Sequence, residues 1–486
     1  SKHILVATYN HLVKAGELAE DPALLARIRM KPMRTLSGVT TVTVLTGPHA
    51  CPGHCIFCPT DERMPKSYLP DEPGGARAFQ NNFDPYEQVR SRIASYKAVG
   101  HPTDKIELLI LGGTWSVYPH DYQEAFVKGC LDAMNGAVSA TLEEAQRLNE
   151  TAAHRNVGMV IETRPDQITP QEIAWMRRLG VTKVQLGAQS LDDEILRLNM
   201  RGHDSAALLE AVKLLRAGGF KLVLHWMPNL LGATPASDRV DFARLWQGFC
   251  PDELKIYPTQ LMETAELYHY WQRGEYHPYS TEELISLIAD LKPTVPKYCR
   301  INRIIRDFSS EHVVAGNKRT SLRMDALAEV KRRGEHCSCI RCREVRGKTV
   351  DAESLTLEDL VYHAAGAEEH FLQFTTNDDR LAGYLRLSLP EQDPFEVLGL
   401  EDLRGAAIIR EVHIYGQSLP VGAEQDGAAQ HAGLGTRLIT RAEEIARERG
   451  YQRLAVISAI GTRRYYHARG FVEGSLYQFK RFEGED

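Results

Sequence analysis

Short runs of strand-forming residues recur through the first two thirds of this chain, and most are separated by segments long enough for a helix, such as 170–180 and 205–218. Strands that alternate with crossover helices build a parallel sheet. Six or seven such units in about 270 residues are typical of a barrel or of part of one. We place these strands at residues 41–45, 106–111, 157–161, 181–186, 221–227, 254–257 and 301–305.

The pattern changes near residue 351. Runs at 371–376, 381–389 and 406–415 predict antiparallel strands, followed by a glycine-rich turn, a helix at 436–449, a strand at 454–458 and a final hairpin. The predicted fold class is therefore α/β, with a partial (β/α) barrel fused to an α+β domain through a small basic linker. The predicted domains are an N-terminal basic arm at 1–39, the barrel at 40–310, the linker at 311–350 and the α+β domain at 351–486, in which 422–432 form a surface loop.

Cysteine usage indicates metal binding. Nine cysteines are present, and six of them lie in two tight clusters. No run of about 18 apolar residues exists, so we expect no membrane helix, and the first residues are too polar for a secretory signal. We expect a cytoplasmic protein, in which clustered cysteines bind metals more often than they form disulfides.

The first cluster follows the first predicted strand and consists of Cys51, Cys55 and Cys58, with the spacing C-x3-C-x2-C. Three thiolates on one loop can bind three irons of a 4Fe–4S cluster and leave the fourth iron open to another ligand. The alternative is a structural zinc site completed by His49 or His54.

Several polar or glycine residues stand at the carboxyl ends of predicted strands, where barrels carry their chemistry. With the cysteines, this arrangement resembles the radical-SAM superfamily. The resemblance implies that the cluster binds S-adenosylmethionine and cleaves it to a 5′-deoxyadenosyl radical. It also implies that Gly112 and Gly113 meet the methionyl amino group, and that Glu162 and Gln189 contact the nucleoside.

A second motif, Q-x-x-G-x-G, opens the helix of the C-terminal domain. Glycines at a helix N-terminus let backbone N–H groups approach a diphosphate. The motif resembles the acetyl-CoA loop of GNAT acetyltransferases, in which a tyrosine of a later segment, here Tyr465 or Tyr466, protonates the leaving thiolate. The motif residues are Gln430, Gly433, Leu434, Gly435 and Thr436.

Both motifs occur together with the segments 31–38, 84–86, 104–107, 254–259 and 410–416, and this combination resembles the catalytic subunit of Elongator in its bacterial or archaeal single-chain form. The resemblance implies that the radical removes hydrogen from the acetyl methyl of acetyl-CoA. The carbon then adds to C5 of the wobble uridine in a tRNA anticodon stem-loop, and hydrolysis leaves a carboxymethyl group. An external one-electron donor is implied, other subunits are not required, and a homo-oligomer is possible.

The same resemblance assigns further residues. The acetyl-CoA contacts fall on Lys105 in the barrel, on the segment Glu411, Val412, His413 and Ile414, on Leu434 to Thr436, and on Tyr465. Lys255, inside a predicted barrel strand, is a second candidate for the reaction chamber; the simpler interpretation is a strand-end lysine with its amine in water.

Charge supports an RNA substrate. The net charge is −6, but residues 297–348 hold 14 Lys and Arg against 6 Asp and Glu, so this segment carries +8 and the remainder −14. Basic clusters bind nucleic-acid phosphates. The basic residues in question are Arg27, Arg29, Lys31, Arg34, Lys318, Arg319, Arg323, Lys331, Arg332, Arg333, Arg341 and Arg343.

The second cluster, Cys337, Cys339 and Cys342, lies inside this basic segment. Three thiolates so close in sequence predict a structural Zn²⁺ site, with His336 or Cys299 as candidates for the fourth ligand. A second Fe–S cluster and reduced thiols are the alternatives.

Two other functions compete with RNA carboxymethylation. The chain could acetylate protein lysines, with a structural barrel, or bind tRNA with little chemistry of its own. The intact first cysteine cluster argues against the former, and the intact 430–436 loop with Tyr465 argues against the latter.

Overall fold

The computed structural model describes residues 2–30, 35, 38–346, 350–415 and 433–482. The predicted loop at 422–432, with Gln430, therefore lies outside the described residues, as do Lys31 and Arg34. Seven strands form a parallel sheet in chain order, so that β1 and β7 remain its two edges. The predicted half-barrel is confirmed, and every predicted run overlaps its strand. The strands are β1 (Thr40–Leu45), β2 (Lys105–Leu111), β3 (Arg155–Thr163), β4 (Lys183–Gln189), β5 (Lys221–Trp226), β6 (Glu253–Ile256) and β7 (Arg300–Ile304).

Alternation along these strands separates a packed outer face from a polar inner face. In β2, Ile106 and Leu108 are fully buried in the core, whereas Glu107 and Leu109 line a cavity. The same period of two, which is the side-chain period of a strand, is found in β4, β5 and β6. Charged residues at alternate positions therefore point into the barrel, and the aliphatic residues between them hold the helices outside.

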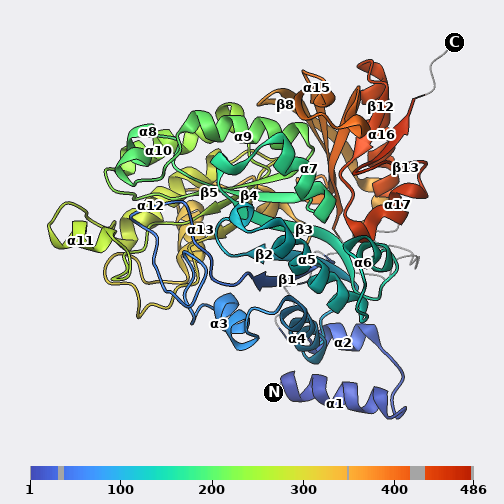
Figure 1. Cartoon of the computed structure of the whole chain (residues 1–486), viewed down its shortest axis with the longest axis horizontal. Helices are drawn as coiled ribbons and strands as arrows, with labels where there is room; N and C mark the ends of the chain where they lie inside the picture. The colour runs from blue at the N-terminus through green and yellow to red at the C-terminus, as the bar shows by residue number, and fades with distance from the viewer. Residues whose placement is uncertain (1, 31–34, 36–37, 347–349, 416–432, 483–486) are drawn as a thin grey trace.

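Helices cover the outer face of the sheet (Figure 1). Three of them, α4, α7 and α10, begin alike, with an Asp or Thr whose side chain accepts a backbone N–H and a proline in the first turn. This is a strong helix-start signal. None of the described helices is long and apolar enough to cross a membrane. The barrel helices are α3 (Pro73–Gln80), α4 (Pro85–Ala98), α5 (His120–Asn135), α6 (Leu142–Asn149), α7 (Pro170–Leu179), α8 (Asp193–Leu198), α9 (Ser205–Ala217), α10 (Pro235–Arg244), α11 (Leu267–Gln272) and α12 (Thr281–Leu291), preceded by α1 (Lys2–Lys14) and α2 (Pro22–Ile28).

A second seven-stranded sheet, orange to red in Figure 1, follows after the linker helices α13 (Leu322–Arg332) and α14 (Ile340–Arg343). Its order is β13-β14-β12-β11-β10-β9-β8. The mostly antiparallel sheet was predicted, but its first strand was not, because that strand is exposed and rich in acidic residues. The elements are β8 (Thr356–Ala364), β9 (Ala367–Thr375), β10 (Leu381–Pro390), α15 (Pro394–Leu398), β11 (Ala406–Ile414), α16 (Leu434–Glu448), β12 (Arg453–Val456), α17 (Arg463–His467), β13 (Val472–Glu473) and β14 (Gln478–Arg481).

A buried ionic network joins the two sheets. Asp252, just before β6, accepts hydrogen bonds from Arg410 of β11 at 2.5 Å and lies 3.3 Å from Arg386 of β10. Arg410 also contacts Glu369 of β9 at 2.8 Å, and Glu369 lies 3.1 Å from Arg216 of α9. All five side chains are at most 1% exposed. The network fixes the second sheet at the amino-terminal ends of the barrel strands.

We expect Asp252→Asn to lower the free energy of unfolding by roughly 3–5 kcal/mol, because it leaves two buried guanidinium groups short of a counter-charge. Urea denaturation measures this. Glu194→Gln, which removes an exposed ion pair with Arg197, is the control and should leave the unfolding curve unchanged. A variant Asp252→Asn as stable as the wild type would contradict this account of the domain interface.

Candidate active site

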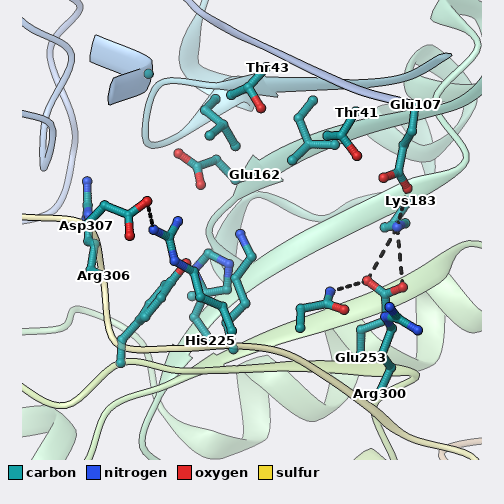
Figure 2. Close-up of a pocket in the computed structure, with 18 of the residues that line it drawn as sticks. Thr41, Thr43, Glu107, Glu162, Lys183, His225, Glu253, Arg300, Arg306 and Asp307 are labelled. Carbon is teal, nitrogen blue, oxygen red and sulfur yellow. Dashed lines mark hydrogen bonds and ion pairs between the residues drawn. The ribbon is translucent and has the colours of Figure 1, made fainter. Parts of the chain in front are cut away.

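One cavity of about 1260 Å³ runs through the barrel. Its walls include the first cysteine loop at the carboxyl ends of the strands and residues of β11 at their amino-terminal ends. Figure 2 shows side chains from several barrel strands converging on it. The cysteine loop and β11, which are far apart in the sequence, therefore share one chamber.

The first cysteine loop forms one end of this cavity. Cys51, Cys55 and Cys58 all line it. A hydrogen bond from Cys58 and the charge of Arg201, whose Nη1 lies 3.6 Å from Cys55 Sγ, lower the pKa of Cys55 to about 5. Thiolates, rather than thiols, bind metals. Among the described residues, only the second cysteine group has all its sulfur atoms within 4.8 Å, so the first trio is more widely spread, as ligands to different irons of one cluster are.

Gly112, Gly113 and Glu162 meet beside the cysteines. Glu162 Oε1 accepts hydrogen bonds from the backbone N–H groups of Gly112 at 3.1 Å and Gly113 at 2.8 Å, and from the Tyr68 hydroxyl at 2.5 Å. Only glycine fits at 112, because its φ is +148° and a Cβ would lie 1.8 Å from Thr46 Oγ1. These contacts fix the glycine turn at the cavity wall.

Two buried polar atoms in this part of the cavity have no partner among the described residues: Gln189 Oε1 and Arg164 Nη1. Buried polar atoms without partners are uncommon, and these two are placed so that a bound molecule in the cavity could satisfy them. Arg164 also donates to the backbone carbonyl of Arg201 at 3.0 Å. The donor set of this end (three cysteines, two buried arginines, an amide oxygen and a carboxylate) fits a 4Fe–4S cluster with S-adenosylmethionine.

Lys255 occupies the middle of the chamber. It lines the cavity, and its amine donates a hydrogen bond to Gln185 Oε1, which also lies 2.9 Å from His225 Nε2. Burial and the charge of Lys255 hold the pKa of His225 well below its usual range, so this imidazole is neutral. The Lys255 amine therefore has a protein partner inside the barrel.

A chain of alternating charges occupies the other half of the barrel (Figure 2). Lys183 contacts Glu107 at 2.5 Å and Glu253 at 3.4 Å. Lys221 contacts Glu253 at 2.6 Å and also Glu411 of the second sheet. Although burial opposes ionisation, Lys221 and Arg386 lower the pKa of Glu411 to about 2. This series of ion pairs therefore connects the barrel to the second sheet.

The residues of β11 close this end of the cavity. Glu411, Val412 and His413 line it, as does Tyr466 of α17. Burial lowers the pKa of His413 to about 4, and its Nε2 is buried without a partner among the described residues. Ile414 ends the strand. All four predicted β11 residues therefore lie at or beside the chamber.

The start of α16 lies next to α17. Gly433 precedes the helix with a φ of +69°, and a Cβ on Gly435 would lie 2.5 Å from the Tyr465 hydroxyl. Arg469 stacks on the Tyr465 ring and donates to Thr436 Oγ1 at 3.1 Å. Tyr465 therefore faces the helix start, whereas Tyr466 is buried and faces the cavity. Leu434 is part of the core.

Lys105 begins β2 and does not line the cavity in the described structure. Burial lowers its pKa. Its register partner Arg155 packs against Gly461 of the second domain, so Lys105 lies at the end of the barrel that the second domain covers.

The second cysteine group is compact. The sulfur atoms of Cys337, Cys339 and Cys342 lie within 4.8 Å of one another, and neither His336 nor Cys299 belongs to this group. The buried Lys292 amine lies 3.5 Å from Cys337 Sγ. Three converging thiols fit a Zn²⁺ ion, whose Zn–S bonds are about 2.3 Å.

Comparison with known proteins agrees with this geometry. The Radical SAM superfamily matches residues 46–245, the Radical SAM C-terminal domain matches 251–333, and the Acetyltransferase (GNAT) family matches 340–471. A "tRNA uridine(34) acetyltransferase" from Dehalococcoides mccartyi is 43% identical, over 93% of this chain and all of the relative. The chain belongs to the Elongator protein 3 family.

Other members of the Elongator protein 3 family are similarly close. The human "Elongator complex protein 3" is 35% identical over 94% of this chain and 86% of its own length. The solved structure of Methanocaldococcus infernus Elp3 with an N-terminal deletion superposes with a TM-score of 0.80 at 37% identity, covering 92% of this chain and 99% of that one.

Sequence reasoning missed several cavity residues. Arg201 and Arg164 interact with the cysteine loop, and Glu107, Lys183, Lys221 and Glu253 form the charge chain. For the charge chain, the available signal was a charged residue near the start of an otherwise aliphatic strand. For Arg164 it was the position just after a predicted strand, and no comparable signal marked Arg201.

Proposed function

We propose that this protein carboxymethylates C5 of the wobble uridine in tRNA, with acetyl-CoA as the source of the two-carbon unit. The observation that supports this most strongly is the single cavity, which reaches both the cysteine loop and β11. When bound, a 4Fe–4S cluster and S-adenosylmethionine supply a radical able to remove hydrogen from an unreactive methyl group. The names of the relatives, which refer to tRNA uridine(34), support the choice of substrate.

The residues divide into two groups in this proposal. Cys51, Cys55 and Cys58 hold the cluster. Gly112, Gly113, Glu162 and Gln189 bind S-adenosylmethionine, and the unpartnered Gln189 Oε1 offers it a hydrogen-bond acceptor. Lys255, which lines the cavity, contacts the uracil base or the acetyl group in this proposal.

The second group binds acetyl-CoA. The start of α16, with Gln430, Gly433, Gly435 and Thr436, binds the diphosphate, because backbone N–H groups and the helix dipole favour anions there. The segment from Glu411 to Ile414 contacts the pantetheine arm, with Lys105 near it. Burial raises the pKa of both Tyr465 and Tyr466, so either hydroxyl keeps its proton at neutral pH and can donate it to the leaving thiolate.

We further propose the domain boundaries 1–39, 40–310, 311–350 and 351–486. They agree with a parallel sheet that ends at Ile304 and a second sheet that begins at Thr356.

An external one-electron donor reduces the cluster.

Anaerobic incubation with tRNA, acetyl-CoA, S-adenosylmethionine and a reductant, followed by nucleoside mass spectrometry, tests the main proposal. We expect carboxymethylated uridine from the wild type and none from Cys55→Ser, which should still bind tRNA. Cys130→Ala, at a buried cysteine outside the cavity, should retain activity. Acetylated protein lysines without modified uridine would instead establish a lysine acetyltransferase.

We also propose that the second cysteine group holds a structural Zn²⁺. Cys339→Ser should remove zinc, measured by elemental analysis, and lower the melting temperature while leaving the iron content unchanged. Equal zinc in the variant and the wild type would contradict this assignment.

A further inference from the structure

The half-barrel is open between its two edge strands. β1 and β7 each pair with only one neighbour in the sheet, yet the cavity is lined from both. Thr41 and Thr43 of β1 contribute on one side, and Asn302 of β7 on the other. Figure 2 shows the two threonines directed into the cavity. We call this gap between β1 and β7 the edge opening.

Three arginines line the β7 side of the edge opening: Arg323 on α13, Arg341 on α14, and Arg346, here called the arginine trio. Among the described residues, their guanidinium groups donate hydrogen bonds to backbone carbonyls alone. Arg323 bonds Ile301 O at 3.2 Å, Arg341 bonds Asn302 O at 2.9 Å, and Arg346 bonds Arg341 O at 2.7 Å.

No carboxylate within the described ranges pairs with any of the three, since the nearby Glu344 is paired with Arg300. Three guanidinium groups without a carboxylate partner in the described part of the chain therefore stand together at the cavity wall. Other basic residues of the segment differ, because Arg332, Arg333 and Arg343 form ion pairs within the protein.

The side chains around the arginine trio suit the binding of a nucleic acid. Met324, beside Arg323, lines the same cavity and is 65% exposed, so it offers an apolar surface to a base. Arg92 of α4, on the β1 side, also lines the cavity, and its Nε is buried without a partner in the described chain. Sites that hold single-stranded RNA combine a cationic groove with surfaces on which bases stack, and here the cations are arginines and the apolar surface is Met324.

We propose that the arginine trio binds phosphodiester groups of RNA next to the target nucleotide, and that the target base enters the chamber sideways through the edge opening. This inference rests on the proposed function. A base must leave its stack to reach the mid-barrel residues His225 and Lys255. Phosphates held at the opening keep the flanking backbone outside while the base points inward.

The phosphates of acetyl-CoA are the other possible source of this anion. The trio lies on α13, α14 and the residues after them, whereas the helix start suited to the CoA diphosphate, Gly433 to Thr436, belongs to the second domain. Val345, next to Arg346, donates its N–H to Leu381 of β10, so the trio reaches both domains. The exposed Met324 beside Arg323 favours RNA, and the parallel measurement with acetyl-CoA separates the two sources.

The test measures binding of an anticodon stem-loop by fluorescence anisotropy between 50 and 200 mM salt, in parallel with binding of acetyl-CoA. Each phosphate contact on a single strand contributes about 0.7 to the slope of log K against log salt. A triple variant, R323Q/R341Q/R346Q, should therefore lose about 2 from this slope and bind the stem-loop at least tenfold more weakly at low salt, with unchanged affinity for acetyl-CoA.

Arg197→Gln is the matched control, because this arginine lies outside the cavity lining, is 68% exposed and is paired with Glu194; it should match the wild type. If the triple variant does not fold, the single variant Arg346→Gln replaces it in the test, because Arg346 is exposed. This variant should lose about 0.7 from the slope of log K against log salt. An unchanged slope in these variants, or loss of acetyl-CoA binding instead of RNA binding, would overturn the proposal. Failure of the wild type to bind or modify tRNA would instead refute the proposed function itself.

Discussion

The buried ionic network of Asp252, Arg410, Arg386 and Glu369 determines how the second domain packs against the barrel. Its charges are withdrawn from water and are stable only when every partner is in place. It therefore specifies one orientation of the second sheet against the barrel. Because Glu411 follows Arg410 in β11, the same orientation brings Glu411 to Lys221 and makes β11 a wall of the barrel cavity.

A shared chamber has a chemical consequence. A reactive radical must meet its target before it meets water or another side chain, and enclosure shortens the path between them. Arg164 and Arg201 make the cysteine end of the chamber cationic. At the far end, the charged side chains of the barrel form ion pairs with one another. The imidazoles of His225, beside Lys255, and of His413, on β11, are neutral and add polar groups without charge to the chamber wall.

Local features of the fold were predictable from sequence. Strand runs, proline-marked helix starts, the cysteine spacing and the Gly112–Gly113 turn all depend on neighbouring residues. Features that depend on distant partners were not: Arg410 and Asp252 are 158 residues apart, and Lys221 and Glu411 are 190 apart. The edge strand β8 was missed because an exposed strand lacks the apolar pattern that identifies buried ones. Lys105 was expected in the chamber, but it lies at the covered end of the barrel, outside the cavity lining.

The central claim is that the acetyl carbon passes to the uridine within one chamber, by bond formation at its methyl carbon. Acetyl-CoA carrying a fully deuterated methyl group tests it directly, with the modified nucleoside analysed by mass spectrometry. The account predicts a carboxymethyl group that keeps two of the three deuterons, since one is removed before the new bond forms. A product that keeps all three would show that the acetyl group moves intact through its carbonyl carbon, and it would contradict the account.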